Sequence, residues 1–298
     1  MYYNLELFGN EIRALREKFG YSRGKLSEIS YLNVDTIRRI ETNFGSVPSR
    51  DILESLSISL KRDLNQLLLQ HRIDDSSLFN DIKIILENKI NVGNIDLNNE
   101  IEDLKNIYNP DIRSFVQIEI QQLILLATGI IEYENKDYDN ALERFYATIL
   151  INTPGFTIDR FEEYVYSDLE VRTLMNIAFI LNRKGNLELF IKILEFCIDS
   201  IDISNPLYNK LCHNLSGAFI RKMDYEKSLD YANKGILYCE LKSTCEGLHI
   251  IYYGKALAEF YLEDKEYENS INKAIALCEI FKYEDFKEFI FKSDLVKK

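Results

Sequence analysis

The chain has 298 residues, of which 46% are hydrophobic and 28% are charged, and this globular composition argues against a disordered protein. The formal net charge of −12 argues against a nucleic-acid partner for the chain as a whole. The charge is uneven, however, because residues 1–72 hold 11 Lys and Arg against 9 Asp and Glu, a net charge of +2, which leaves −14 for residues 73–298. The N-terminal part alone can therefore approach phosphates.

The sequence predicts an all-α protein of the cytoplasm. Only 4 prolines and 12 glycines interrupt the chain, and the apolar residues mostly recur at spacings of three and four, which is the helical period. The five cysteines are scattered without a CxxC pair, which indicates reduced thiols, and three histidines are too few for a multi-ligand metal site. We expect no metal and no cofactor. The N-terminus lacks a signal-peptide pattern, and the longest apolar run, Leu123 to Ile131, is too short to span a bilayer, so no membrane partner is expected.

The first seventy residues carry the pattern of five short helices. The second to fifth helices each begin after a residue type that caps helix N-termini well: Ser22, Asn33, Ser49 and Asp63. Gly20 ends the first helix, since a left-handed conformation is least costly for glycine. The second and third helices, residues 23–30 and 34–42, are separated by only a few residues, and such a tight corner is typical of a helix-turn-helix.

The order of these residues resembles the repressor-type helix-turn-helix family of phages and bacterial regulators. The likeness is carried by Gly9-x-x-Ile12-Arg13-x-x-Arg16, Gly20-x-Ser22-x-x-x-Leu26-Ser27, Thr36-Ile37-x-x-Ile40-Glu41, and then Pro48, Leu53, Leu56 and Leu60. Three residues depart from the family pattern. Arg23 replaces the usual glutamine, Tyr31 replaces the glycine of the turn, and Asn43 replaces the glycine after the third helix. Asn tolerates a positive φ, whereas tyrosine at position 31 is less favourable in the turn than glycine.

This resemblance implies that the third helix enters the major groove of DNA. It places Val34, Asp35 and Arg38 near base edges and Thr36 near a phosphate; Arg can bind guanine, Asp can accept from cytosine, and Val can contact a thymine methyl group. Positive residues at the start of the second helix suit phosphates. The predicted DNA-binding residues are Arg23, Lys25, Val34, Asp35, Thr36, Arg38 and Arg39. The alternative interpretation is a solvated charged face.

Residues 74–90 have the pattern of an amphipathic helix that residues 91–94 interrupt. Its inward residues are predicted to be Leu78, Ile82, Ile85 and Leu86. The sequence thus predicts three parts: a helix-turn-helix domain over residues 1–70, a linker helix over 71–95, and a domain over 96–298 that binds an effector and dimerises.

Four segments beyond residue 100 share the pattern helix, short polar turn, helix. Aligning one turn residue of each segment gives Tyr138, Leu187, Tyr225 and Tyr267, spaced 49, 38 and 42 residues apart. Nine residues earlier stand the small residues Gly129, Ala178, Ser216 and Ala258, and three residues later stand Ala141, Phe190, Ser228 and Ser270. This pattern resembles the tetratricopeptide repeat and predicts a right-handed α-solenoid, closed by an incomplete unit around residues 281–291.

The first helices of such repeats line a concave surface. Eleven residues before the turn residue stand Asn176 and Asn214, and a side-chain amide offers both a donor and an acceptor to the backbone of an extended peptide. Cations one helix turn away, Arg172, Lys210 and Lys255, suit carboxylates of a peptide, with Met175, His213 and Tyr252 nearby. Alternatively, the two asparagines hydrogen-bond neighbouring helices within the stack.

Together the parts resemble the peptide-responsive quorum-sensing regulators of Gram-positive bacteria, most nearly the PlcR branch, alongside the Rgg regulators. The resemblance implies a homodimer that binds a short signalling peptide in the repeat groove and double-stranded DNA at a palindromic promoter site. It also implies that Asn176 and Asn214 match peptide-holding asparagines and that Lys89 lies near a lysine that meets the peptide.

The sequence leaves two other classes of function to consider. The repeats of such a regulator could bind a partner protein rather than a peptide, as in a phage repressor. An enzyme is disfavoured by three scattered histidines and by the absence of a Gly-rich phosphate loop, a GxSxG motif and a distinctive carboxylate pair.

Overall fold

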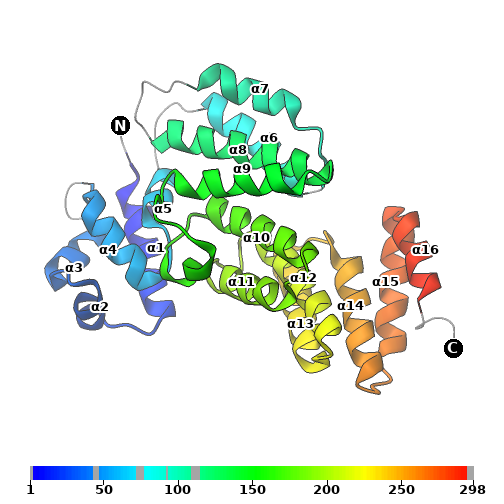
Figure 1. Cartoon of the computed structure of the whole chain (residues 1–298). Coiled ribbons are helices and arrows are strands. Elements are labelled where there is room, and N and C mark those ends of the chain that lie inside the picture. Colours follow the sequence, from blue (N-terminus) through cyan, green and yellow to red (C-terminus); the bar gives the residue numbers. More distant parts are fainter. Residues whose placement is uncertain (1–2, 43–46, 72–76, 92, 109–114, 294–298) are drawn as a thin grey trace. The chain divides into compact units, whose positions relative to one another are not determined.

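The computed structural model describes residues 3–42, 47–71, 77–91, 93–108 and 115–293. Within these ranges every element of secondary structure is a helix (Figure 1), and this confirms the predicted all-α class. The chain forms two compact units, Met1–Asn176 and Ile177–Lys298. The three-part division at residues 70 and 95 stays a prediction.

Five helices form an N-terminal head, matching the five predicted there: α1 (Leu5–Lys18), α2 (Arg23–Ser30), α3 (Val34–Glu41), α4 (Arg50–Leu60) and α5 (Leu64–Gln70). Three of the four predicted caps are made as expected. Ser22, Asn33 and Asp63 accept hydrogen bonds from N–H groups of the helices that they precede, at 3.0, 2.8 and 2.8 Å. Ser49 precedes α4 but makes no side-chain capping hydrogen bond.

The helices of the head enclose one apolar core. Its most deeply buried side chains are Phe8, Ile12, Leu26, Ile37, Leu56, Leu60 and Leu64. Burial of each such side chain stabilises the fold by about 1.5–3 kcal/mol. Gly9 is required for the packing of α1 on α3, because a Cβ at this position would collide with the backbone carbonyl of Ile40. This explains the glycine in the sequence pattern of the head.

The rest of the first unit contains α6 (Ser77–Asn91), α7 (Asn98–Ile107), α8 (Phe115–Glu134), α9 (Tyr138–Leu150), the short 3-10 helix η1 (Ile158–Glu163) and the start of α10 (Asp168–Arg183). The buried stripe of α6 is Phe79, Ile82, Leu86 and Ile90. The prediction that Ile85 points inward is wrong, since its side chain is 49% exposed. Ile85 immediately precedes Leu86 and so lies about 100° around the helix from it, on the outer side of the buried stripe. The side chain of Leu78 lies outside the described residues.

Helix α8 is the one helix among the described residues with the length and apolar composition of a membrane-spanning segment. Core helices of soluble proteins have the same properties. In this chain α8 packs along α9, and its Gln122 side chain is buried, donating to the carbonyl of Thr148 at 3.0 Å and to a carboxylate oxygen of Glu170 at 3.1 Å. A polar contact of this kind ties α8 to its helical neighbours.

The second unit continues the repeats with α11 (Leu187–Asp199), α12 (Leu207–Lys222), α13 (Tyr225–Lys242), α14 (Leu248–Tyr261), α15 (Tyr267–Phe281) and α16 (Glu284–Lys292). The aligned turn residues Tyr138, Leu187, Tyr225 and Tyr267 are the first residues of α9, α11, α13 and α15. The helix pairing expected from the sequence is therefore confirmed. Helix α16 occupies the place of the predicted incomplete unit.

Small residues lie where the paired helices approach most closely, as the alignment predicts. Gly129, Ala178, Ser216 and Ala258 are all buried. The Ser216 hydroxyl lies 3.0 Å from the hydroxyl of Ser228, which stands at the aligned position of the second helix. At Gly129 the approach is closer still, because a Cβ would lie 2.6 Å from the Phe145 ring. The erosion of the repeat sequence has thus spared the positions that helix packing restricts.

Candidate nucleic-acid interface and ligand-binding residues

The α2–α3 corner is built around a residue with positive φ. Tyr31 follows α2 with φ 56° and ψ 23°, the left-handed conformation for which a glycine is usual at this position. Its side chain is 95% exposed, so the corner accommodates tyrosine without placing the ring in the core. Asn33 then caps α3, and the helix-turn-helix geometry is present despite the departure at Tyr31. The departure at Asn43 lies outside the described residues.

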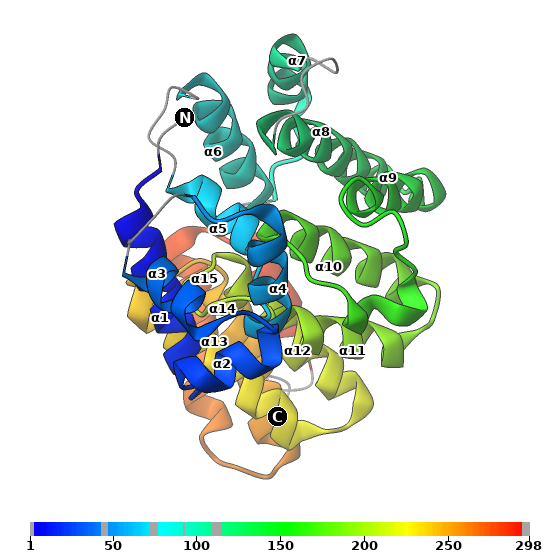
Figure 2. The same cartoon turned by 90° about the vertical axis from the view of Figure 1, so that its left-hand side faces the viewer.

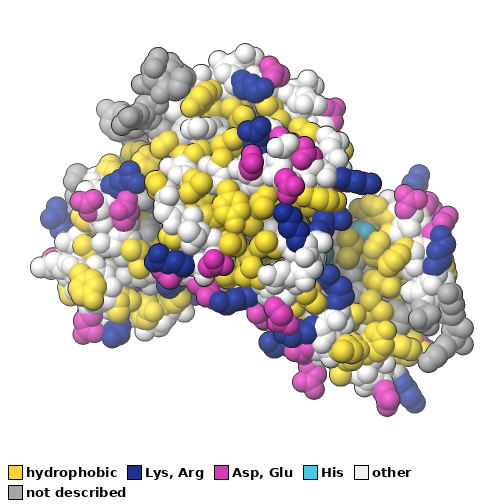
Figure 3. Space-filling view, in the orientation of Figure 1, with side chains coloured by type: hydrophobic (Ala, Val, Ile, Leu, Met, Phe, Trp, Pro, Cys, Tyr) yellow, Lys and Arg dark blue, Asp and Glu magenta, His cyan; other side chains and the backbone are white. Residues whose placement is uncertain are grey.

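Helix α3 presents the predicted base-contacting residues to solvent. Val34 is 42% exposed, and the side chains of Asp35 and Arg38 are 73% and 60% exposed. The Arg38 guanidinium lies 3.2 Å from the Asp35 carboxylate, a surface ion pair that costs little to break. Thr36 is half-buried, and Arg39 is exposed. On the face shown in Figure 3, positive and negative side chains of the head are interspersed.

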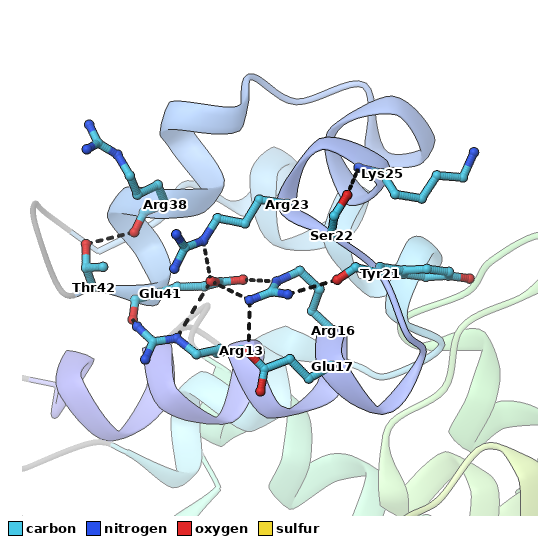
Figure 4. A network of polar contacts seen from close by, with 10 residues as sticks. All are labelled: Arg13, Arg16, Glu17, Tyr21, Ser22, Arg23, Lys25, Arg38, Glu41 and Thr42. Atoms are coloured by element: carbon cyan, nitrogen blue, oxygen red, sulfur yellow. Dashed lines mark hydrogen bonds and ion pairs between the residues drawn. The ribbon is translucent and has the colours of Figure 1, made fainter.

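Arginines from α1 and α2 converge on Glu41 at the end of α3 (Figure 4). The Glu41 side chain is 0% exposed and accepts from Arg16 Nε at 2.6 Å, from Arg16 Nη2 at 3.1 Å and from Arg23 Nε at 2.8 Å. Arg13 donates to the Glu41 backbone carbonyl at 3.0 Å. Burial alone would raise the pKa of Glu41, but the hydrogen bonds from Arg16 and Arg23 outweigh burial and hold the pKa below its usual range. This network fixes α3 on α1 and α2.

The network gives Arg23 a role that the sequence analysis missed. Its Nε is bound to Glu41, and its side chain is 36% exposed, so only part of the guanidinium faces solvent. Lys25 is more exposed, at 55%, and pairs with Glu28 in the same helix at 3.1 Å. The sequence holds one sign of this network, which is the i, i+3 spacing of Arg13 and Arg16 in α1. Their partner Glu41 lies far along the chain, so the spacing alone does not identify it.

In the first unit, Asn176 and Arg172 form a hydrogen-bonded pair on α10. Asn176 Nδ2 donates to the Arg172 carbonyl at 2.9 Å, and Arg172 Nη2 donates to Oδ1 of Asn91 in α6 at 2.8 Å. Met175 is 2% exposed, so its side chain has no free surface to offer a ligand. Lys89, also in α6, is bound to Glu100 at 2.7 Å. Each position stays a prediction as a peptide contact.

In the second unit, Asn214 repeats this geometry on α12. Its Nδ2 donates to the carbonyl of Lys210 at 2.7 Å and lies 3.0 Å from His213 Nε2. Because an amide NH₂ is only a donor, His213 Nε2 must accept here, and the proton of the neutral ring resides on Nδ1. That nitrogen is buried without a hydrogen-bond partner among the described residues. Burial, reinforced by Lys210 and His249, lowers the pKa of His213 to about 4.

Helix α14 packs on α12 and carries the remaining two predicted residues, Tyr252 and Lys255. Lys255 Nζ lies 2.8 Å from a Glu259 carboxylate oxygen and 3.0 Å from Asn233 Oδ1. The other carboxylate oxygen of Glu259 is buried without a hydrogen-bond partner among the described residues. Tyr252 is half-buried beneath Lys273, whose Nζ lies 5.2 Å from the ring centre.

The cysteines of this unit form no disulfides among the described residues. Cys197, Cys212, Cys239 and Cys278 are buried and Cys245 is exposed. Burial raises the pKa of Cys212 to about 12, which leaves this thiol protonated and unreactive. Groups of three or more potential metal-binding side chains do not occur among the described residues.

A helix-turn-helix head followed by paired helices of the tetratricopeptide type defines this architecture. PlcR of Bacillus thuringiensis has the same fold: its crystal structure in complex with the peptide PapR7 and DNA matches this chain with a TM-score of 0.57 and 20% sequence identity, over 97% of this chain and 100% of PlcR. Apo PlcR matches with a TM-score of 0.54, 20% identity and coverage of 97% and 99%. These matches confirm that the likeness inferred from sequence extends to the fold.

Apo ComR of S. thermophilus matches with a TM-score of 0.50 and 18% identity, over 99% of this chain and 100% of ComR. No protein-family model matches the sequence, and no curated protein does. The shared fold is therefore visible in the arrangement of the helices while the sequences have diverged.

Proposed function

We propose that this chain is a cytoplasmic DNA-binding transcriptional regulator, and not an enzyme, whose activity is controlled by a short signalling peptide bound to its helical repeats. The observation that carries the proposal is the combination of an exposed recognition helix in a helix-turn-helix head with the full-length fold of PlcR, which has been crystallised with a peptide and DNA. A homodimer on a palindromic site follows from the same likeness, with half-sites about one helical turn of DNA, or a multiple of it, apart.

The DNA-binding part of the proposal is tested by selecting duplexes from a randomised library with the full chain. The most strongly selected duplex is then titrated with wild-type protein and with Arg38→Ala. Arg38 is expected near a base edge, so its loss should weaken binding to the selected duplex by about tenfold or more, with relaxed preference at one base pair. Lys18→Ala, which removes a positive charge from the end of α1, is the matched control and should change the affinity by less than threefold. Failure to enrich any duplex would overturn this part of the proposal.

The peptide part is tested by calorimetric titration of a library of short synthetic peptides, repeated with an Asn176→Ala, Asn214→Ala double variant. Each asparagine donates to its own helix and so presents Oδ1 as an acceptor. We expect the double variant to bind at least tenfold more weakly, since two hydrogen bonds to the peptide backbone are lost. Unchanged affinity would refute the assignment of these residues, and capture of a folded protein in place of any peptide would favour the partner-protein alternative.

A further inference from the structure

A cavity of about 520 Å³ lies in the first unit, where the head meets the repeats. One wall comes from α4 and α5, and the other comes from α8 and from the segment that leads into α10. Helix α5 lies beside the start of α10 (Figure 2), where Arg62 pairs with Asp168 at 2.7 Å and Gln66 accepts from the Asp168 N–H at 2.7 Å. These contacts hold the two walls together, and the volume is in the range that small-molecule sites occupy.

Gln122 of α8 lines this cavity, although the residue is only 3% exposed. Its Nε2 donates to the Thr148 carbonyl at 3.0 Å and to Glu170 at 3.1 Å, whereas its Oε1 makes no hydrogen bond within the part of the chain that the structure describes. The donor side of this buried amide is therefore committed to the protein, which leaves Oε1 as an acceptor for a ligand in the cavity.

Glu170 of α10 is a second buried polar group of the cavity, with an exposure of 2%. Its carboxylate accepts from Gln122, from Asn152 Nδ2 at 3.1 Å and from the Ser167 N–H at 2.8 Å. All three donors are neutral, so these hydrogen bonds bring no positive charge to the carboxylate. Burial raises the pKa of Glu170, and the negative charge of the nearby Asp63 adds to this rise.

Asp63, at the start of α5, is the corresponding carboxylate on the wall that the head provides. It accepts from the N–H groups of Asn65 and Gln66 at 2.8 and 3.0 Å, and its removal from solvent raises its pKa although Arg62 acts in the opposite direction. Asp63 and Glu170 therefore bring two negative charges close enough to repel each other at the cavity. A positively charged group bound between them would relieve this repulsion.

Carboxylates outnumber cations around the cavity. Its lining includes one basic side chain, Arg50, and five acidic side chains: Glu54, Asp63, Glu119, Glu163 and Glu170. Three of the acidic side chains already pair with cations, Glu54 with Arg50, Glu119 with Lys83 and Glu163 with Arg160. Asp63 and Glu170, which accept from neutral donors, are therefore the acidic groups that a positively charged ligand would complement best.

Apolar side chains also line the cavity, among them Ile58 of α4, Ile118 of α8 and Leu169 of α10. Such surface favours contact with hydrocarbon and not with a hydrated ion. A metal ion is a poor fit for a second reason, since the described ranges of the chain hold no group of three or more metal-binding side chains. The lining instead complements ammonium groups, which donate hydrogen bonds to acceptor oxygens, carried on an aliphatic skeleton.

We propose that this cavity binds a small organic cation that carries several N–H donors on an aliphatic skeleton, a linear polyamine being the simplest example. Asp63 and Glu170 hold its ammonium groups, Gln122 Oε1 accepts one further hydrogen bond, and the apolar side chains contact its methylene groups. The described residues that line the cavity include none of those proposed to contact DNA or a signalling peptide. This site is therefore additional to the proposed function and does not depend on it.

The test is calorimetric titration of the full chain with spermidine, a linear triamine, and with a linear octanediol as a neutral ligand of similar length. Physiological ionic strength screens the general attraction of a cation to an acidic protein. Glu170→Gln and Asp63→Asn each remove one charge and keep the helix starts, because Gln can complete a capping box and Asn is a good N-cap. Glu143→Gln is the matched control, since it removes the same charge from an exposed position of α9 in the same unit.

We expect saturable binding of one spermidine per chain and no binding of octanediol. The Kd for spermidine should rise about tenfold in Glu170→Gln and in Asp63→Asn, and should stay within about twofold of wild type in Glu143→Gln. In the wild-type chain, bound spermidine should slow hydrogen exchange in residues 57–66 and 163–170, a readout that requires no variant to fold.

Three results would each overturn the inference: titration without saturation, equal weakening by Glu143→Gln, or protection from exchange only outside these two segments. The titrations contain neither DNA nor peptide, so their outcome is separate from success or failure of the proposed function.

Discussion

Replacing Glu41 by Gln removes one negative charge from the point where three arginines meet and leaves the size of the side chain unchanged. The side chains of Glu41 and Arg16 are 0% and 9% exposed, so the variant leaves the buried Arg16 guanidinium with only the exposed carboxylate of Glu17, at 3.3 Å, as a counter-ion. Removal of one partner from a buried ion pair typically lowers the free energy of unfolding by about 3–5 kcal/mol. We expect about 3 kcal/mol here, since the partly exposed Arg13 and Arg23 can turn to solvent and the new amide oxygen still accepts one hydrogen bond.

The loss should be confined to the head, because the network joins only α1, α2 and α3. The chain has no tryptophan, so unfolding is best followed by hydrogen exchange and mass spectrometry of peptides from these helices in the intact protein. Arg23→Gln is the companion variant: its side chain is 36% exposed, and about 1 kcal/mol is expected. A Glu41→Gln head within 0.5 kcal/mol of wild type would refute the view that this carboxylate holds α3 in place.

Two further predictions concern the repeats. Gly129→Ala should destabilise the first unit by about 1–3 kcal/mol, because the new methyl group would lie 2.6 Å from the Phe145 ring. Gly217→Ala, in α12 with open space around it, should instead stabilise the protein by about 0.5–1 kcal/mol. Chemical denaturation of the two variants decides whether this contrast exists. Burial and the charge of Lys210 lower the pKa of His213 to about 4 in the folded chain, against about 6.5 in the unfolded chain. The contribution of this neutral ring to stability is therefore complete above pH 6.5. It is lost as the pH falls toward 4, by at most about 3 kcal/mol. Urea titrations between pH 7 and 4 should show this loss, and His213→Gln should be less dependent on pH over that range; equal pH profiles would contradict the burial of the ring.

The elements of this chain could be predicted from sequence because each depends on local rules. Helix starts at Ser22, Asn33 and Asp63 follow from capping chemistry, and the turn residues that begin α9 and α11 follow from the repeat spacing. The prediction that Ile85 is buried was wrong for a local reason as well. A helix covered on one side buries a single stripe, and the adjacent apolar residues Ile85 and Leu86 of α6 could each have formed the edge of that stripe. The class of fold and the helix pairs could therefore be predicted from the sequence.

The partners of charged side chains could not be predicted in the same way. Arg23 was expected to face a phosphate from its place at the start of α2, yet its Nε is committed to Glu41, eighteen residues later. Arg62 meets Asp168 across 106 residues, a pairing that no spacing rule connects. Such contacts depend on how whole helices are placed, and a sequence pattern reports the residue type without reporting that placement.

The asparagines on α10 and α12 show what the placement adds. The sequence identifies Asn176 and Asn214 as groups that could either donate or accept. In the structure each NH₂ group is bound to the carbonyl four residues earlier in its own helix, at 2.9 and 2.7 Å, which commits the donor side of the amide and leaves Oδ1 as the acceptor. A ligand must then supply N–H donors, as the backbone of an extended peptide does whatever its side chains. Selectivity among peptides would therefore have to come from other positions. Among these, Lys255 on α14 and the Glu259 carboxylate oxygen that has no hydrogen-bond partner within the described residues differ most from an amide in their chemistry.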